Sequence, residues 1–136
     1  MQFYLTGHKG LLGNLIKNYS NDNAIPLKFN SYKKEIYPQL SINGEELDIV
    51  HCGATLNLNF DKNILYKKNF LSTKQIVDYL ACQKQSRLIY VSANSIGNKE
   101  VLNKGNYPKD KYNLFKYKSE NYIRKRLKPS RFIIIR

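Results

Sequence analysis

A tyrosine and a lysine that stand four residues apart, Tyr112 and Lys116, are the side chains of this sequence best placed for proton transfer. In a helix, residues at this spacing lie on the same face. A nearby ammonium group favours the phenolate and lowers the pKa of a tyrosine from its reference value of about 10, toward the working range of a general acid or base. The chain contains 11 tyrosines and 23 lysines and arginines, so the pair arises easily by chance and its meaning depends on its place in the fold.

Three glycines near the start of the chain are spaced as in a loop that holds a phosphate. They lie between an apolar run and a helix candidate, which is the context that such a loop requires. The first glycine allows a tight turn, the second a close approach to a pyrophosphate, and the third close packing of the helix on the sheet, while the first helical N–H groups face the anion. A structural turn is the competing interpretation. The predicted binding residues here are Gly7, His8, Lys9, Gly10, Leu11, Leu12 and Gly13.

Apolar runs alternate with helical patterns along the whole chain. The runs predict strands at residues 2–6, 26–30, 48–54, 87–92 and 131–136. Apolar residues at helical spacing predict three helices, the second of them kinked or divided near Lys67, at residues 11–19, 61–84 and 112–127. We therefore predict an α/β fold, a three-layer doubly wound parallel sheet with helices on both faces and the first strand central.

Length and composition limit the class of protein. A chain of 136 residues suits one domain, residues 1–136. Asparagine and lysine interrupt the apolar runs, so we expect no signal peptide or membrane span and a soluble, cytoplasmic protein. Cys52 and Cys82 have no metal-ligand spacing to each other or to His8 and His51, which predicts reduced core cysteines and no metal site. His51 itself, a lone histidine in an apolar run, is interpreted as a satisfied core residue.

The formal net charge of +13 would ordinarily indicate a nucleic-acid partner. Here the basic residues are spread along the chain, and the densest stretch, at residues 117–128, has an apolar helical stripe of its own. This stretch is interpreted as a solvated helix face. A basic nucleic-acid-binding domain is therefore the less favoured alternative.

Taken in order, these motifs resemble the extended short-chain dehydrogenase/reductase family of sugar-nucleotide epimerases, dehydratases and reductases. Residues 6–13 match its TGxxGxxG, residues 48–54 resemble its strand that ends in small residues beside the cofactor, and residues 112–116 match its YxxxK. Asn69 falls where the family has a helix asparagine. The resemblance spans the whole chain, and the sequence looks most like dTDP-4-dehydrorhamnose reductases and GDP-fucose synthases.

The resemblance implies an NAD(P)-binding Rossmann fold that transfers a hydride at a nucleotide-sugar carbon. It assigns proton transfer to Tyr112 and the nicotinamide ribose to Lys116. The third catalytic group of the family is a hydroxyl after the strand at residues 87–92, for which Ser92 is the candidate, although alignment without a gap places Ala93 there. Beyond the glycine loop, the cofactor contacts that the resemblance implies are Asn30, Cys52, Gly53, Ala54, Asn69 and Lys116.

The sequence favours NADP over NAD. A carboxylate after the second strand would bind a ribose 2′-hydroxyl, but Asn30 stands there and Lys33 and Lys34 follow. Lys9 matches a basic position that lies near the 2′-phosphate in GDP-fucose synthases. Neither NADP nor NAD is excluded by these residues.

Members of the family continue into a second lobe that closes over the sugar nucleotide. The resemblance therefore implies that the C-terminal substrate lobe is lacking, by truncation or because a second chain supplies it, and that this chain alone has little activity. The apolar strand at residues 131–136 also predicts a homodimer, because such edges associate. A non-catalytic dinucleotide-binding or interaction module is the alternative function.

Overall fold

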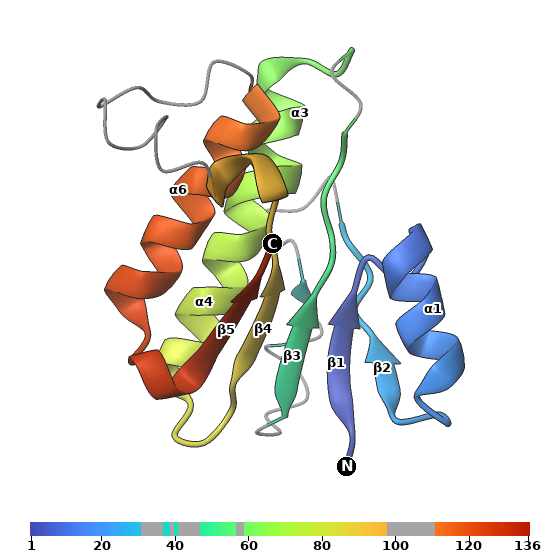
Figure 1. Cartoon of the computed structure of the whole chain (residues 1–136). Helices are drawn as coiled ribbons and strands as arrows, with labels where there is room; N and C mark the ends of the chain where they lie inside the picture. Colours follow the sequence, from blue (N-terminus) through green and yellow to red (C-terminus); the bar gives the residue numbers. More distant parts are fainter. Residues whose placement is uncertain (31–36, 39, 41–46, 57–58, 98–110) are drawn as a thin grey trace.

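The fold is built on a five-stranded parallel sheet. The computed structural model describes residues 1–30, 37–38, 40, 47–56, 59–97 and 111–136. Every strand pairing is parallel, in the order β2-β1-β3-β4-β5, which confirms the predicted α/β fold (Figure 1). The strands are β1 (Phe3–Thr6), β2 (Ala24–Pro26), β3 (Asp48–His51), β4 (Leu88–Val91) and β5 (Phe132–Ile135).

Helices lie on both faces of this sheet, as predicted. In Figure 1, α1 (Leu11–Tyr19) lies to one side, and the other helices cover the opposite face. None of the described helices is long and apolar enough to cross a membrane. The remaining helical segments are α3 (Lys62–Tyr66), η1 (Lys67–Leu71), α4 (Ser72–Cys82), η2 (Asn94–Gly97), α6 (Lys111–Arg126) and η3 (Pro129–Arg131).

The main core lies between the sheet and the helices α4 and α6. Side chains alternate between the two faces of a strand, and the register puts Tyr4, Ile49 and Leu88 in one row. All three are fully buried, together with Ile76 of α4 and Ile123 of α6. Burial of these apolar side chains is the main stabilising contribution to the sheet–helix interface.

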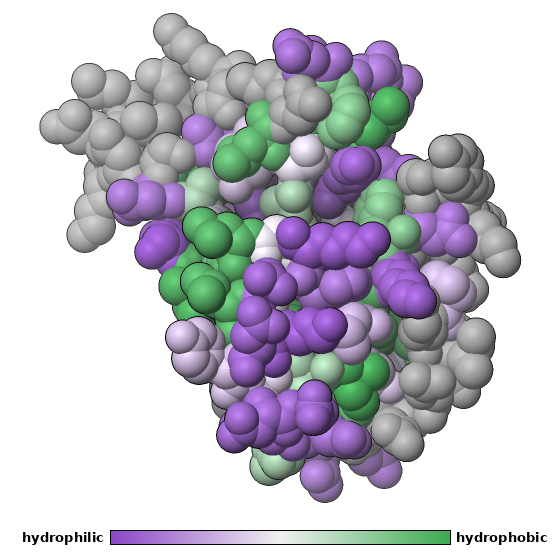
Figure 2. Space-filling view, turned by 90° about the vertical axis from the view of Figure 1, so that its right-hand side faces the viewer, coloured by the Kyte–Doolittle hydropathy of each residue, from purple (hydrophilic) through white to green (hydrophobic). Residues whose placement is uncertain are grey.

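The opposite face of the sheet is apolar but less covered. Leu5 of β1 is buried there, whereas Ile133 and Ile135 of β5 are 59% and 50% exposed. The apolar side of α1 also remains exposed, including Leu12 and Leu15, and Figure 2, which views the molecule from the side of α1, shows hydrophobic surface gathered along one edge. This face is therefore available for further packing.

Two details of the predicted sheet were wrong. β3, and not β1, is the central strand, because β2 adds to one side of β1 and β4 and β5 both add beyond β3. The second strand occupies Ala24–Pro26, and not residues 26–30. β1 ends at Thr6, so the last contact along this edge is the bond from the Leu27 N–H to the Leu5 carbonyl at 2.8 Å. After Leu27 this segment therefore has no residue of β1 beside it to pair with.

A long helical region follows β3, where the sequence predicted one kinked helix or two consecutive helices, and its three segments are contiguous. A π-helical turn, η1, joins α3 to α4. Such turns recur at functional sites, and this one contains the predicted site residue Asn69. Lys33 and Lys34 lie outside the described residues.

The two cysteines differ from expectation in one respect. Both are free thiols, as predicted. Cys52 is partly buried after β3, but Cys82 is exposed, so its assignment to the core was wrong. Cys82 is the last residue of α4, where the helix leaves the core.

Arg131 joins the end of α4 to the last strand. Its guanidinium donates hydrogen bonds to the carbonyls of Leu80 at 3.0 Å, Gln83 at 2.8 Å and Ser86 at 3.0 Å. A cation is favourable at a helix C-terminus, where carbonyls lack helical partners. The planar group thus bonds three carbonyls at once, of which that of Leu80 also accepts the Gln83 N–H at 3.1 Å.

We expect Arg131→Met to lower the free energy of unfolding by about 2 kcal/mol, because the hydrogen bonds from a charged donor to three carbonyls are lost. Urea denaturation followed by circular dichroism would measure this change. Lys128→Met, an exposed cation three residues earlier, is the charge-matched control. Equal unfolding midpoints for the two variants would contradict the capping role.

Candidate functional site

The glycine loop turns sharply at the carboxyl end of β1. Gly7 has a φ of +70°, a conformation that favours glycine. A Cβ at this position would lie 2.8 Å from the carbonyl carbon of Cys52 and from the nitrogen of Gly53. The loop after β1 and the loop after β3 are therefore in direct backbone contact, which no larger residue at position 7 would permit.

The start of α1 forms a cradle for an anion. The Gly10 N–H donates to the Gly7 carbonyl at 2.8 Å, and the first helical bond runs from the Asn14 N–H to the Gly10 carbonyl at 2.8 Å. The N–H groups of residues 11–13 therefore have no helical acceptor. Gly10 provides no side-chain cap, and the first turn contains no acidic residue. A Cβ at Gly13 would lie 2.6 Å from the Gly7 carbonyl carbon. This geometry fits a pyrophosphate.

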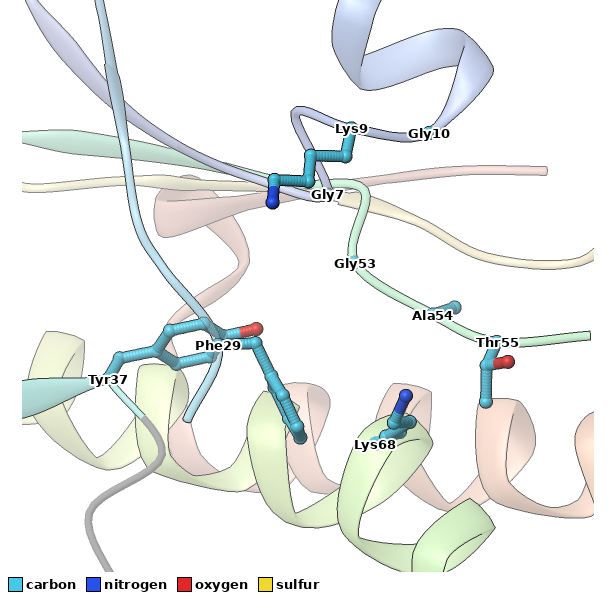
Figure 3. A pocket seen from close by; sticks show the side chains of 9 residues that line it. All are labelled: Gly7, Lys9, Gly10, Phe29, Tyr37, Gly53, Ala54, Thr55 and Lys68. Atoms are coloured by element: carbon cyan, nitrogen blue, oxygen red, sulfur yellow. The ribbon is translucent and has the colours of Figure 1, made fainter. Parts of the chain in front are cut away.

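A cavity of about 310 Å³ opens beside this cradle. We call it the main cavity because residues of the loops after both β1 and β3 line it. Lys9 reaches over it from the glycine loop, while Lys68 rises from η1 on the opposite side, with the Tyr37 hydroxyl between these walls (Figure 3). Its size falls within the range of about 300–1,000 Å³ typical of ligand sites. The lining residues are Gly7, Lys9, Gly10, Phe29, Tyr37, Gly53, Ala54, Thr55 and Lys68.

Sequence reasoning missed Lys68. Its ammonium lies 4.8 Å from the ring centroid of Phe60 and 5.7 Å from that of Phe29, within the distance of a cation–π interaction. The two rings hold the charge at the wall of the cavity. The available signal was its position directly before the asparagine landmark, Asn69.

A second hollow, which shares Gly7, Lys9 and Phe29 with the first cavity, is basic. The described residues of its lining include His8, Lys9 and Lys28 and no carboxylate. Burial lowers the pKa of His8, and the nearby ammonium groups of Lys17, Lys9 and Lys28 lower it further. Positive charge therefore gathers where an anionic group would be stabilised. Lys28 was missed because the sequence placed it in a strand.

Asn69 holds the loop after β3. Its side-chain amide donates to the Thr55 carbonyl at 3.0 Å and accepts from the Thr55 N–H at 2.7 Å, and its own carbonyl accepts from Ser119 at 3.0 Å. Asn69 is buried. The amide is thus engaged with the backbone of the cavity wall.

The structure brings Tyr112 and Lys116 together on α6. The Lys116 Nζ donates to the Val91 carbonyl at 2.7 Å and lies 6.0 Å from the ring centroid of Tyr112 and 4.6 Å from that of Tyr90. Lys116 is 2% exposed, and this burial lowers its pKa to about 8. Val91 ends β4, so the ammonium lies at the same edge of the sheet as the loops after β1 and β3.

Ser92 points its hydroxyl at another partner. The Oγ donates to Glu120 at 2.6 Å, and this buried carboxylate also pairs with Arg136 at 2.6 Å and Arg124 at 2.9 Å. Ala93, the next residue, has no hydroxyl. The site therefore holds a phenol and an ammonium, while the predicted strand hydroxyl is directed at α6.

The remaining residues predicted to contact the cofactor fall into two groups. Gly53 and Ala54 line the main cavity, whereas Asn30 and Cys52 do not appear in the lining of either cavity. Cys52 is half-buried, and burial raises the pKa of its thiol. The structure thus gathers the glycine loop, Gly53 and Ala54 around one space.

Two solved structures share this fold. The ADP-L-glycero-D-manno-heptose-6-epimerase of Helicobacter pylori is 16% identical, with a TM-score of 0.64 over 90% of this chain and 50% of its own. The UDP-glucuronic acid 4-epimerase of Bacillus cereus, solved in complex with NAD, is 16% identical, with a TM-score of 0.70 over 98% of this chain and 55% of its own. This chain thus spans about half the length of either protein. A comparison with curated protein sequences gives no significant match.

A family comparison covers most of the chain. Residues 42–136 match an NAD-binding family described as male sterility protein. The matched region runs from before β3 to the end of β5 and includes the cavity wall at residues 53–55, Asn69, Tyr112 and Lys116. Together with the fold shared with these two epimerases, this match supports the resemblance to extended short-chain dehydrogenases/reductases. The chain belongs to the male sterility protein family of NAD-binding domains.

Proposed function

We propose that this NAD(P)-binding domain holds NADP and serves hydride transfer at a carbon of a nucleotide sugar. The observation that supports it best is the position of Lys116, whose Nζ lies on the last carbonyl of β4, at the sheet edge that also carries the glycine loop and Gly53. Ligands of open α/β sheets bind at this carboxyl edge. The phenol of Tyr112 lies beside the same ammonium.

Each group has a distinct part in the proposed chemistry. The cradle at the start of α1 binds the pyrophosphate, and the nicotinamide, when bound, supplies or accepts the hydride. Tyr112 gives or takes the proton of the sugar oxygen. The Lys116 ammonium favours the phenolate form and offers donors to the nicotinamide ribose.

The preference for NADP rests on the charges around the glycine loop. Lys9 and Lys28 line the basic hollow, Lys9 and Lys68 line the main cavity, and no carboxylate is among the described residues of either lining. A carboxylate there would repel a 2′-phosphate, whereas ammonium groups bind it. Lys9 lines both spaces, so it is the residue to test.

We expect Lys9→Glu to raise the dissociation constant of NADPH about 30-fold, because one charge-assisted contact becomes a repulsion worth about 2 kcal/mol in all. The dissociation constant of NADH should change less than about threefold. Isothermal titration calorimetry would compare the two. Lys128→Glu, at an exposed residue that lines neither cavity, makes the same change in net charge. Equal affinities of the unmodified chain for NADPH and NADH would contradict the proposed preference for NADP.

We expect the isolated chain to turn over slowly. A missing hydrogen-bond donor to the reacting oxygen costs about 2.7–4 kcal/mol of barrier lowering, and Ala93 and the engaged Ser92 leave that donor unfilled. NADPH oxidation would be assayed with dTDP- and GDP-keto sugars, the substrates suggested by the resemblance. Turnover above about 1 s⁻¹, an ordinary enzyme rate, would contradict this expectation.

A partner is part of the proposal. The exposed apolar residues of β5 and α1 suit either a second copy of the chain or a chain that supplies the substrate lobe. Light scattering of this chain alone separates the two cases, because a second copy gives a dimer, whereas a different partner chain leaves a monomer. A non-catalytic dinucleotide-binding module is the second candidate function, and the bond from Ser92 to Glu120 is the observation that favours it.

A further inference from the structure

His51 links three elements of the fold through its two ring nitrogens. It ends β3 and is fully buried. The Nδ1 lies 2.5 Å from the Thr6 Oγ1 of β1, and the Nε2 lies 2.9 Å from the Thr73 Oγ1 of α4. The Thr6 Oγ1 also accepts the Gly53 N–H at 2.9 Å. A hydrogen-bonded chain therefore runs from α4 through the sheet to the loop after β3.

The imidazole of His51 is neutral within this hydrogen-bonded series. Burial lowers the pKa of His51 to about 3, so one ring nitrogen donates a hydrogen bond and the other accepts one. We infer that the Thr6 hydroxyl, which already accepts the Gly53 N–H, gives its own proton to the Nδ1 of His51. The Nε2 then carries the ring proton and donates to Thr73. All the bonds in this chain then run in one direction, from Gly53 to Thr73.

One end of this hydrogen-bonded chain lies at the cofactor loops, and the other lies in the core. Thr6 directly precedes Gly7, and Gly53 lines the main cavity and contacts the backbone of Gly7. Thr73 is buried, belongs to the helix that continues from η1, and lines neither cavity. An apolar residue would be the ordinary choice at this buried position of a parallel strand. The use of both ring nitrogens indicates a second requirement, the orientation of the Thr6 hydroxyl.

We propose that His51 is a positioning residue, which couples Thr73 in the core to Thr6 and so sets the distance between the glycine loop and the loop after β3. This inference rests on the proposed binding of NADPH. It assigns an effect on cofactor affinity to Thr73, a residue that touches no part of the cavity. This effect would depend on the imidazole of His51, which connects Thr73 to Thr6.

A double-mutant cycle tests this coupling. Thr73→Val removes the hydroxyl but keeps the shape, and we expect it to weaken NADPH binding about fivefold. In a His51→Leu background the same change should have no effect, and combined with Thr6→Val it should add nothing to the effect of Thr6→Val alone. Thr73→Ser should restore the affinity of the unmodified chain. Ser86→Ala, which removes a buried hydroxyl outside the network, is the control.

Two results would overturn the proposal. One is unchanged NADPH affinity in Thr73→Val, and the other is an effect of Thr73→Val that persists without His51. Hydrogen exchange supplies a readout that needs no cofactor, because Thr73→Val should increase the exchange of the Gly53 amide while that of Leu27, bonded to the Leu5 carbonyl, stays unchanged. Nitrogen NMR of the unmodified chain should show the proton of His51 on Nε2. If the chain failed to bind NADPH, the proposed function would fall, and these two measurements would still decide the network.

Discussion

Replacing Gly13 with alanine is expected to abolish dinucleotide binding and to lower the free energy of unfolding by about 3 kcal/mol, the upper range for an overpacked core. The added Cβ would lie 2.6 Å from the Gly7 carbonyl carbon and 3.0 Å from the His8 Cα, both within the backbone of the loop. Gly13 is also the buried contact of α1 with the sheet. With this Cβ added, α1 and the loop after β1 cannot both keep their present positions.

Asn18→Ala is the control for this change, since Asn18 is exposed on the same helix. We expect it to alter the free energy of unfolding by less than about 0.5 kcal/mol. Urea denaturation and NADPH titration would be measured on both variants. A Gly13→Ala chain with unchanged stability and affinity would show that the cradle tolerates a side chain, and the assignment of the site would be lost.

The second large effect is a dependence of stability on pH that originates at Lys116. Burial lowers its pKa from 10.5 to about 8 in the folded chain. Below pH 8 the ammonium is charged in both states, and the folded state bears the cost of the buried charge. Between pH 8 and 10.5 the folded state loses the proton first, so the free energy of unfolding should rise with pH, by about 3 kcal/mol in total.

Lys116→Met should abolish this rise, because it removes the titrating group. The measurement is the difference in unfolding free energy between the two chains from pH 7 to 10.5, which cancels the titration of the tyrosines. Lys118→Met, at an exposed position of α6, should keep the dependence of the unmodified chain. Parallel pH profiles for Lys116→Met and the unmodified chain would mean that the ammonium is solvated. We also expect Lys116→Met to weaken NADPH binding, since Lys116 is assigned to the ribose.

Much of the site could be predicted because its parts are local in sequence. The glycine spacing and the four-residue interval from Tyr112 to Lys116 each lie within about one or two turns of helix, so the backbone alone sets their geometry. The core histidine was also predictable, since His51 stands in an apolar run and proved to be buried and hydrogen-bonded. The order of the strands was only partly predictable, because the pattern of a buried parallel strand is the same at any position in a sheet.

What the sequence by itself determined is therefore the α/β class, the glycine loop and the helix that bears Tyr112 and Lys116. The tertiary structure alone decided which distant groups meet. Lys116 reaches Val91, Asn69 clamps Thr55, and Ser92 turns toward Glu120, pairs that are 14 to 28 residues apart. The physical reason is that short spacings are fixed by the helix or strand that contains them, whereas the direction of a side chain between two elements depends on how the whole core packs.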